Sequence, residues 1–337
     1  MAPMRTTQRL VPNGDGWHLS LNQTYDPDRL RPRRRPVLII PGYGMNSFIY
    51  SYHPNGPSLE GYLAEAGLEV WRADLRGQGG SIRAGGGDEH GLADLALTDV
   101  RALVDAVLDG TRTGADRVDV IGGSLGGSLM FAHAALVPEN RMASLVCIGT
   151  PVRWEKLHPL LRALFASPRV AGAIRFRGSR PLAEVLLPLL ARFAPSLLSI
   201  YLNAEITDLS AAREMVRTVE DPNRFMNREI AVWIRQRDLV IDGTNIAEAL
   251  ERLTNPLLCV LARGDGIVPP ETASFAFHRI GSRVKKLVEV GSEAMTVAHA
   301  DLFVSREAQA RVFAPICEFL LEQGIERAEA RRSNTAG

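Results

Sequence analysis

The chain has 337 residues, and its 39 Lys and Arg against 38 Asp and Glu give a formal net charge of +1. This balance excludes nucleic-acid binding driven by bulk charge, and 46% hydrophobic residues with 23% charged residues exclude wholesale disorder. The cysteines, Cys147, Cys259 and Cys317, each lie in an apolar run, without CxxC or metal-ligand spacing. The sequence therefore predicts reduced core thiols, no metal site, no cofactor and a cytoplasmic protein.

The most apolar stretch of the chain is residues 181–202. It carries Glu184 and Arg192 and is interrupted by Pro188, whereas a membrane-spanning helix needs about 20 nearly uncharged residues. Residues 1–16 lack the apolar core of a signal peptide. We therefore expect soluble helices with a large apolar face, and transient contact with a membrane or lipid surface stays open.

Elements can be predicted in chain order from the hydrophobic pattern. Residues 6–25 alternate around the turn 13–16, which predicts a β-hairpin. The basic stretch 29–35 is interpreted as a solvated linker, with an anion-binding patch as the alternative. Short apolar runs then alternate with helical segments, and the predicted strands are 37–40, 69–73, 118–121, 145–148, 257–261 and 286–290. This alternation, with helices such as 92–108 and 125–136, predicts an α/β fold with a mostly parallel sheet covered by helices on both faces.

One interval breaks the alternation of strands and helices. Residues 153–255 contain no clear strand and are rich in Leu, Ala, Arg and Pro, which predicts several short helices. An insertion at this place is expected to form a helical cap over the carboxyl ends of the strands, where open α/β sheets bind ligands. The core then comprises residues 1–152 and 256–325, and residues 326–337 are predicted to be a disordered tail.

The strongest motif is Gly122-Gly123-Ser124-Leu125-Gly126, between a predicted strand and a predicted helix. This is the setting of a G-x-S-x-G nucleophile elbow, in which glycines permit a tight turn that raises the serine above the sheet. Ser128 also follows two glycines, but Met130 stands where the closing glycine belongs. Ser124 is therefore the predicted nucleophile, and a glycine-rich turn that only packs is the alternative.

A nucleophilic serine needs a base, and the base needs an acid that orients it. His299 follows the last predicted strand, and Asp265 follows the strand 257–261. The order Ser124, Asp265, His299 predicts a catalytic triad in the chain order of α/β-hydrolases. Asp238 and Asp242 remain alternative acids.

The segment 40–46 follows the first central strand and supplies a candidate oxyanion hole. Backbone N–H groups of Tyr43 and Leu125 are the predicted donors, and Gly42, Gly44 and Met45 are expected to line the substrate site.

Together these motifs resemble the α/β-hydrolase superfamily over residues 36–323. The resemblance rests on residues 41–44, 74–79, 122–126 and 265–269 and on His299. The D-x-R-G-x-G turn at 74–79 is expected to be structural, and Pro41 departs from the His that many members have before the first glycine. Segments 233–245 and 256–270 are most similar to bacterial enzymes related to polyhydroxyalkanoate synthases and acid lipases. The synthases use Cys at the elbow, so Ser124 favours ester hydrolysis over polymerisation.

The resemblance implies a serine hydrolase that cleaves hydrophobic carboxylic esters. Leucines of the cap, such as Leu186 and Leu190, are candidates for an acyl pocket, although most are expected to be helix core. An acyltransferase that uses the same acyl-enzyme and a non-catalytic ligand-binding protein remain alternatives. The acyl chain length, the alcohol, the oligomeric state and the role of the basic residues in 169–180 stay open.

Overall fold

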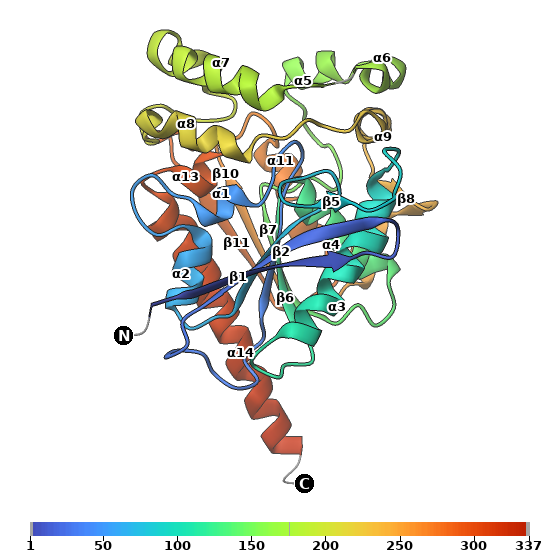
Figure 1. Ribbon diagram of the computed structural model, residues 1–337, viewed down its shortest axis with the longest axis vertical. Coiled ribbons are helices and arrows are strands. Elements are labelled where there is room, and N and C mark those ends of the chain that lie inside the picture. The colour runs from blue at the N-terminus through green and yellow to red at the C-terminus, as the bar shows by residue number, and fades with distance from the viewer. Residues whose placement is uncertain (1–2, 175, 335–337) are drawn as a thin grey trace.

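The fold is built on one twisted sheet, seen at the centre of the computed structural model in Figure 1, which describes residues 3–174 and 176–334. The strands pair in the order β1-β2-β4-β3-β6-β7-β10-β11, with β5 beside β2. Their bounds are β1 Arg5–Pro12, β2 Trp17–Tyr25, β3 Val37–Ile40, β4 Val70–Asp74, β5 Ile82–Arg83, β6 Val118–Gly123, β7 Met142–Ile148, β10 Leu257–Ala262 and β11 Lys285–Val290. The sheet is parallel from β4 to β11 and antiparallel where β1, β2 and β5 join it.

The predicted hairpin and the predicted central strands are confirmed, with small differences at their ends. The hairpin turns at Asn13, whose Oδ1 accepts hydrogen bonds from the N–H groups of Asp15 and Trp17. β7 begins at Met142, before the predicted start at 145. The pattern missed this start because Ala143 and Ser144 are small, although Ser144 is fully buried and its hydroxyl donates to the Asp119 carboxylate at 2.8 Å.

Helices cover both faces of the sheet, as predicted. On β3, Leu38 and Ile40 point into one apolar cluster and Val37 and Ile39 into the other, because successive strand residues face opposite sides. The first cluster is completed by η1 Asp94–Asp99, α3 Val100–Gly110, α4 Leu125–Leu136, α10 Ile246–Ala249, η5 Leu250–Arg252, α11 Pro270–Ala273 and α12 Phe275–Arg279. The second is completed by α1 Phe48–Ser51, α2 Leu59–Glu65, α13 Asp301–Val304, η6 Gln309–Phe313 and α14 Ala314–Asn334.

Between β7 and β10 the chain forms a layer of helices above the sheet in Figure 1. The elements are α5 Pro159–Leu164, α6 Pro168–Ala173, α7 Ser179–Phe193, η2 Pro195–Leu198, η3 Leu209–Ala211, α8 Ala212–Met215, η4 Val216–Thr218 and α9 Arg224–Gln236. We call this layer the cap; its predicted boundaries at 153 and 255 stay a prediction.

The interval also contains a hairpin, β8 Val240–Ile241 and β9 Thr244–Asn245, where no strand was predicted. Its turn is Asp242-Gly243, with φ of 47° and 74°, which is the residue pair that tight hairpin turns favour. The sequence signal was therefore present, but the strands are too short to show an alternating pattern.

The segment 326–337 was predicted to be a disordered tail. Instead α14 continues as a helix to Asn334, and residues 335–337 lie outside the described residues. The physical reason lies in the composition of the segment, since the run Glu-Arg-Ala-Glu-Ala-Arg-Arg at 326–332 consists of strong helix formers.

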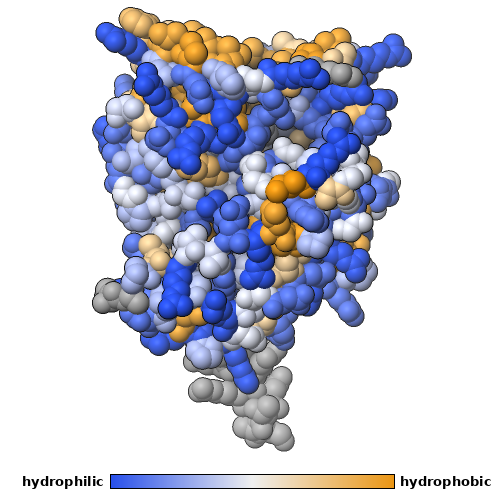
Figure 2. All heavy atoms as spheres, viewed as in Figure 1, coloured by the Kyte–Doolittle hydropathy of each residue, from blue (hydrophilic) through white to orange (hydrophobic). Residues whose placement is uncertain are grey.

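The outer layer of the cap carries apolar side chains on the molecular surface. Figure 2 shows hydrophobic residues gathered along the top of the molecule, over α5, α6 and α7. α7 has no buried residue, although most of its side chains are apolar. Among the described residues, no helix combines the length and the hydropathy needed to cross a bilayer.

Candidate active site

The turn from β6 to α4 has the geometry of a nucleophile elbow. Ser124 has φ 52° and ψ −124°, a backbone conformation that a non-glycine residue rarely adopts. The flanking glycines are required by space: a Cβ on Gly122 would lie 2.4 Å from Cα of Gly127, and one on Gly126 would lie 2.3 Å from the carbonyl oxygen of Ile40. The motif thus follows from how closely α4 and β3 approach this turn.

Ser124 is half-buried, and its N–H donates to the carbonyl oxygen of Ile148 at the end of β7, at 2.8 Å. Its side chain does not cap α4, so the hydroxyl is not tied to the helix that it precedes. Ser128, the other serine of the sequence analysis, is fully buried in α4 and donates to the carbonyl oxygen of Pro151. Of these serines, only Ser124 can reach a ligand.

His299 and Asp265 lie in contact. His299 Nδ1 is 2.6 Å from Asp265 Oδ2, and both side chains are almost completely buried. Asp265 Oδ1 accepts hydrogen bonds from the N–H groups of Ile267 and Val268, both at 2.8 Å. Both oxygens of the carboxylate are therefore engaged, and the carboxylate orients the imidazole so that Nε2 is the ring nitrogen left for proton transfer.

The imidazole and Ser124 meet the same piece of backbone at the end of β7. Ser124 donates to Ile148, and the next residue, Gly149, faces the imidazole: a Cβ there would lie 3.0 Å from Cε1 of His299 and 3.4 Å from Oδ2 of Asp265. Gly149 also has a φ of 54°, so two constraints favour glycine. The three predicted residues thus lie around Ile148 and Gly149, at the carboxyl end of β7.

The alternative acids lie in other environments. Asp238 forms an ion pair with Arg153, whose Nη1 is 2.7 Å from each carboxylate oxygen. Asp242 is exposed in the β8–β9 turn. Among the described residues, neither carboxylate is paired with a histidine, so Asp265 is the acid that the geometry supports.

The predicted oxyanion loop lies against the elbow. A Cβ on Gly42 would lie 3.0 Å from Cβ of Ser124 and 3.1 Å from the sulfur of Met45. Leu125 is the first residue of α4, where a backbone N–H has no acceptor within the helix. Tyr43 follows Gly42, and its phenol donates to Asn227 Oδ1 on α9 at 2.5 Å.

The cap holds this loop along its length. The N–H of Glu220 donates to the carbonyl oxygen of Gly44, and Met45 forms an antiparallel bridge with Val219. Asn46 donates its side-chain amide to Glu220 Oε1 at 2.5 Å. Asn227 and Glu220 were not predicted from the sequence, because no motif marks them and their contacts depend on how the cap packs on the loop.

Two further groups surround the base. Tyr201 lies beside His299, with ring centroids 6.2 Å apart, and burial together with the negative charges of Asp265 and Asp301 raises the pKa of its phenol to about 12. Asp301 accepts from the N–H groups of Ala298 and Asn203, and burial raises its pKa to about 6. Through these hydrogen bonds, Asp301 ties the loop that contains His299 to Asn203 of the cap.

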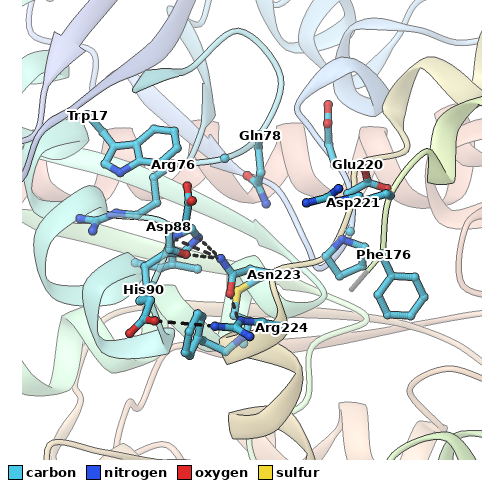
Figure 3. A pocket seen from close by; sticks show the side chains of 18 residues that line it. Trp17, Arg76, Gln78, Asp88, His90, Phe176, Glu220, Asp221, Asn223 and Arg224 are labelled. Carbon is cyan, nitrogen blue, oxygen red and sulfur yellow. Dashed lines mark hydrogen bonds and ion pairs between the residues drawn. The ribbon is translucent and has the colours of Figure 1, made fainter. Parts of the chain in front are cut away.

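A cavity of about 520 Å³ lies on the Gly44 side of the loop (Figure 3). Its lining includes Arg76, His90 and Asn223, while Ser124, Asp265 and His299 are not among the lining residues. Arg76 forms ion pairs with Asp99 and Asp15, which is compatible with the structural role expected of the 74–79 turn. The cavity is therefore lined by other residues than the predicted triad. Among the described residues, no cluster of His, Cys, Asp and Glu is arranged to hold a metal ion.

The sequence profile of the family described as serine aminopeptidase, S33, matches residues 31–292. A search of the curated proteins gives no match. Among solved structures, a hydrolase from Pseudomonas aeruginosa PA01 aligns with a TM-score of 0.62 and 19% identity, over 93% of this chain and 98% of its own.

Two further structures are similar in shape. A thermophilic esterase from Thermogutta terrifontis gives a TM-score of 0.61 at 20% identity, over 95% of this chain and 99% of its own. The monoacylglycerol lipase of Paleococcus ferrophilus gives 0.59 at 17% identity, over 90% and 99%. At such identities the likeness establishes the fold alone, and it confirms the predicted α/β-hydrolase fold.

Proposed function

The chain belongs to the serine aminopeptidase S33 family of α/β-hydrolases, and we propose that it is a serine hydrolase that cleaves hydrophobic carboxylic esters. The observation that carries this proposal is the 2.6 Å contact between His299 Nδ1 and Asp265 Oδ2, beside the strained turn at Ser124. A strained serine followed by a helix N-terminus, with an oriented imidazole nearby, is the arrangement that acyl transfer requires.

In the first half of the reaction, His299 Nε2 takes the hydroxyl proton of Ser124 as the oxygen attacks the ester carbonyl. Asp265 stabilises the imidazolium that forms and keeps the proton of Nδ1 in place. Collapse of the tetrahedral intermediate expels the alcohol, which receives its proton from His299. Ser124 is then acylated.

The backbone N–H groups of Tyr43 and Leu125 stabilise the negative charge of the tetrahedral intermediate by hydrogen bonds. Each oxyanion donor contributes about 3 kcal/mol to lowering the barrier. In the second half of the reaction, water takes the place of the alcohol, and His299 acts again as the base. Hydrolysis of the acyl-enzyme returns Ser124 to its free form.

The proposed substrate class is supported by the apolar character of the cap and by the names of two proteins with a similar structure. Two of the structural neighbours are an esterase and a monoacylglycerol lipase by name. Cap residues such as Met215 are buried against the apolar cluster below the cap, and apolar side chains of this kind are what line an acyl-binding site. Among the described residues, no feature of the site favours an alcohol or thiol over water as acyl acceptor.

The test uses p-nitrophenyl esters of graded acyl length with wild type, Ser124→Ala and Ser282→Ala. Ser282 is a matched control because it precedes β11, at the amino end of a strand, and its hydroxyl contacts only the backbone of Val284. We expect Ser124→Ala to lose hydrolysis and labelling by a fluorophosphonate probe, and Ser282→Ala to keep both. Hydrolysis by Ser124→Ala at the wild-type rate would overturn the proposal, and a folded wild type that neither hydrolyses nor labels would be a binding protein.

A further inference from the structure

α7 presents a continuous apolar stripe to the surface. At 100° per residue, its members fall within about 100° of the helix circumference. The stripe comprises Leu182, Val185, Leu186, Leu189 and Phe193, which are 59, 60, 43, 48 and 72% exposed. Side chains of this kind are usually buried, so a contiguous exposed patch of them marks an interaction surface.

The stripe is not the face by which α7 packs on the protein. α7 begins at a firm anchor, where the Asp221 carboxylate accepts hydrogen bonds from the N–H groups of Gly178 and Ser179. Arg180 adds an ion pair with Glu220 at 2.7 Å. The opposite side of α7 rests on α8 and η4, so the helix is held in place with its apolar stripe outward.

The neighbouring helices extend the apolar surface. Leu160 and Leu164 on α5 are 57 and 47% exposed, and Val170 on α6 is 57% exposed. Figure 2 shows hydrophobic surface along much of the top of the molecule, with hydrophilic residues between and at the ends of it, across the layer that Figure 1 labels α7, α5 and α6. We call this surface the cap face.

Positive charge lies beside the cap face. Arg169 and Arg192 are exposed, and neither has an ion-pair partner among the described residues. Glu184 is the acidic residue on α7. A second copy of this face would bring the same positive charges together, which disfavours self-association, whereas a negatively charged surface is complementary.

We propose that the cap face docks on an anionic lipid surface, with α5, α6 and α7 lying in the plane of the interface. The apolar stripe enters the boundary between headgroups and acyl chains, and the flanking arginines contact the phosphates. The inference concerns binding and does not depend on ester hydrolysis. The anchored helices need no rearrangement to present this face.

The first experiment measures co-sedimentation with phosphatidylcholine vesicles, with and without one quarter phosphatidylglycerol. We expect binding to the mixed vesicles that weakens as salt is raised. Val185→Glu and Leu189→Glu, at exposed positions, should each weaken binding at least tenfold. Val240→Glu and Val284→Glu are matched controls at exposed apolar positions outside the cap face and should bind as wild type does.

The second experiment removes charge and keeps the stripe. Each of Arg169→Gln and Arg192→Gln should weaken binding about fivefold, because a basic residue near an anionic surface contributes about 1 kcal/mol. Equal binding to both vesicle types, no binding at all, or unchanged binding by the stripe variants would overturn the proposal. A dimer in sedimentation velocity that Leu189→Glu dissociates would assign the cap face to a second copy instead.

Each variant is also assayed on p-nitrophenyl acetate, a soluble ester that needs no interface. Vesicle binding lost while this hydrolysis is retained supports docking by the cap face. If wild type binds vesicles but hydrolyses no ester, docking stands and the proposed function fails. The two proposals can therefore fail separately.

Discussion

The fixed orientation of Asp265 makes the outcome of Asp265→Asn predictable. Oδ1 accepts from the N–H groups of Ile267 and Val268, and Oδ2 accepts from His299. An asparagine side chain has one acceptor oxygen and one NH₂ group, so the two backbone donors retain the oxygen. The NH₂ group is then directed at Nδ1 of His299.

An amide that donates to Nδ1 inverts the tautomer of His299. The remaining ring proton moves to Nε2, the atom that must accept the proton of Ser124. Replacing a triad acid by its amide in this way lowers kcat by about 10⁴-fold, which corresponds to about 5 kcal/mol. Thermal unfolding should change little, because the shape of the side chain and both backbone hydrogen bonds are kept.

The assay compares kcat on p-nitrophenyl butyrate for wild type, Asp265→Asn and the control Asp242→Asn. Asp242 is exposed and has a φ of 47°, a conformation that asparagine also tolerates. A folded Asp265→Asn enzyme with a kcat within tenfold of wild type would refute the reasoning. So would an equal loss in Asp242→Asn.

Three further outcomes follow from named contacts. Asn227→Leu leaves the Tyr43 phenol without its acceptor, so kcat should fall about tenfold with little change in KM, and stability should fall by about 1–3 kcal/mol in a urea melt. Gly42→Ala places a methyl group 3.0 Å from Cβ of Ser124, which should lower kcat at least tenfold while the melting temperature is kept; an unchanged kcat would contradict the crowding. Burial lowers the pKa of His133 from 6.5 to about 4, so between pH 6.5 and pH 4 the unfolded chain binds a proton that the folded chain does not. The free energy of unfolding should therefore fall by about 3 kcal/mol as the pH is lowered from 6.5 to 4. Urea melts of His133→Gln should lack this loss.

The central sheet could be predicted because its signals are local. Each buried parallel strand is a short apolar run between turn residues. At the elbow, the apolar run of β6 is followed by glycines and then by the helix α4. The ends of the strands were predicted less accurately. Near the start of β7, Ser144 is buried because its hydroxyl donates a hydrogen bond to Asp119 on the neighbouring strand β6. A sequence pattern does not reveal that a polar residue is buried when its partner belongs to another strand.

The parts of the site that were predicted likewise have local signals in the sequence, whereas the parts that were missed depend on contacts between distant elements. Ser124, Asp265 and His299 each follow a strand or its exit loop, so the order of elements alone brings them to one edge of the sheet. The residues that hold the predicted oxyanion loop lie in the cap, and their contacts depend on how the cap helices pack against the sheet. The apolar stripe of α7 was visible in the sequence, but its exposure was not, because a buried stripe and an exposed stripe have the same spacing.

The two proposed oxyanion donors are held in place by different parts of the protein. Leu125 is placed by the elbow and belongs to the sheet core, whereas Tyr43 is held through Asn227 on α9. The distance between the two proposed donors therefore depends on how α9 of the cap sits on the sheet. A change in the cap that repositions α9 should act on kcat through one donor and leave the contact between His299 and Asp265 intact. Mutations that alter the cap can thus change the rate of acyl transfer without touching the residues that carry it.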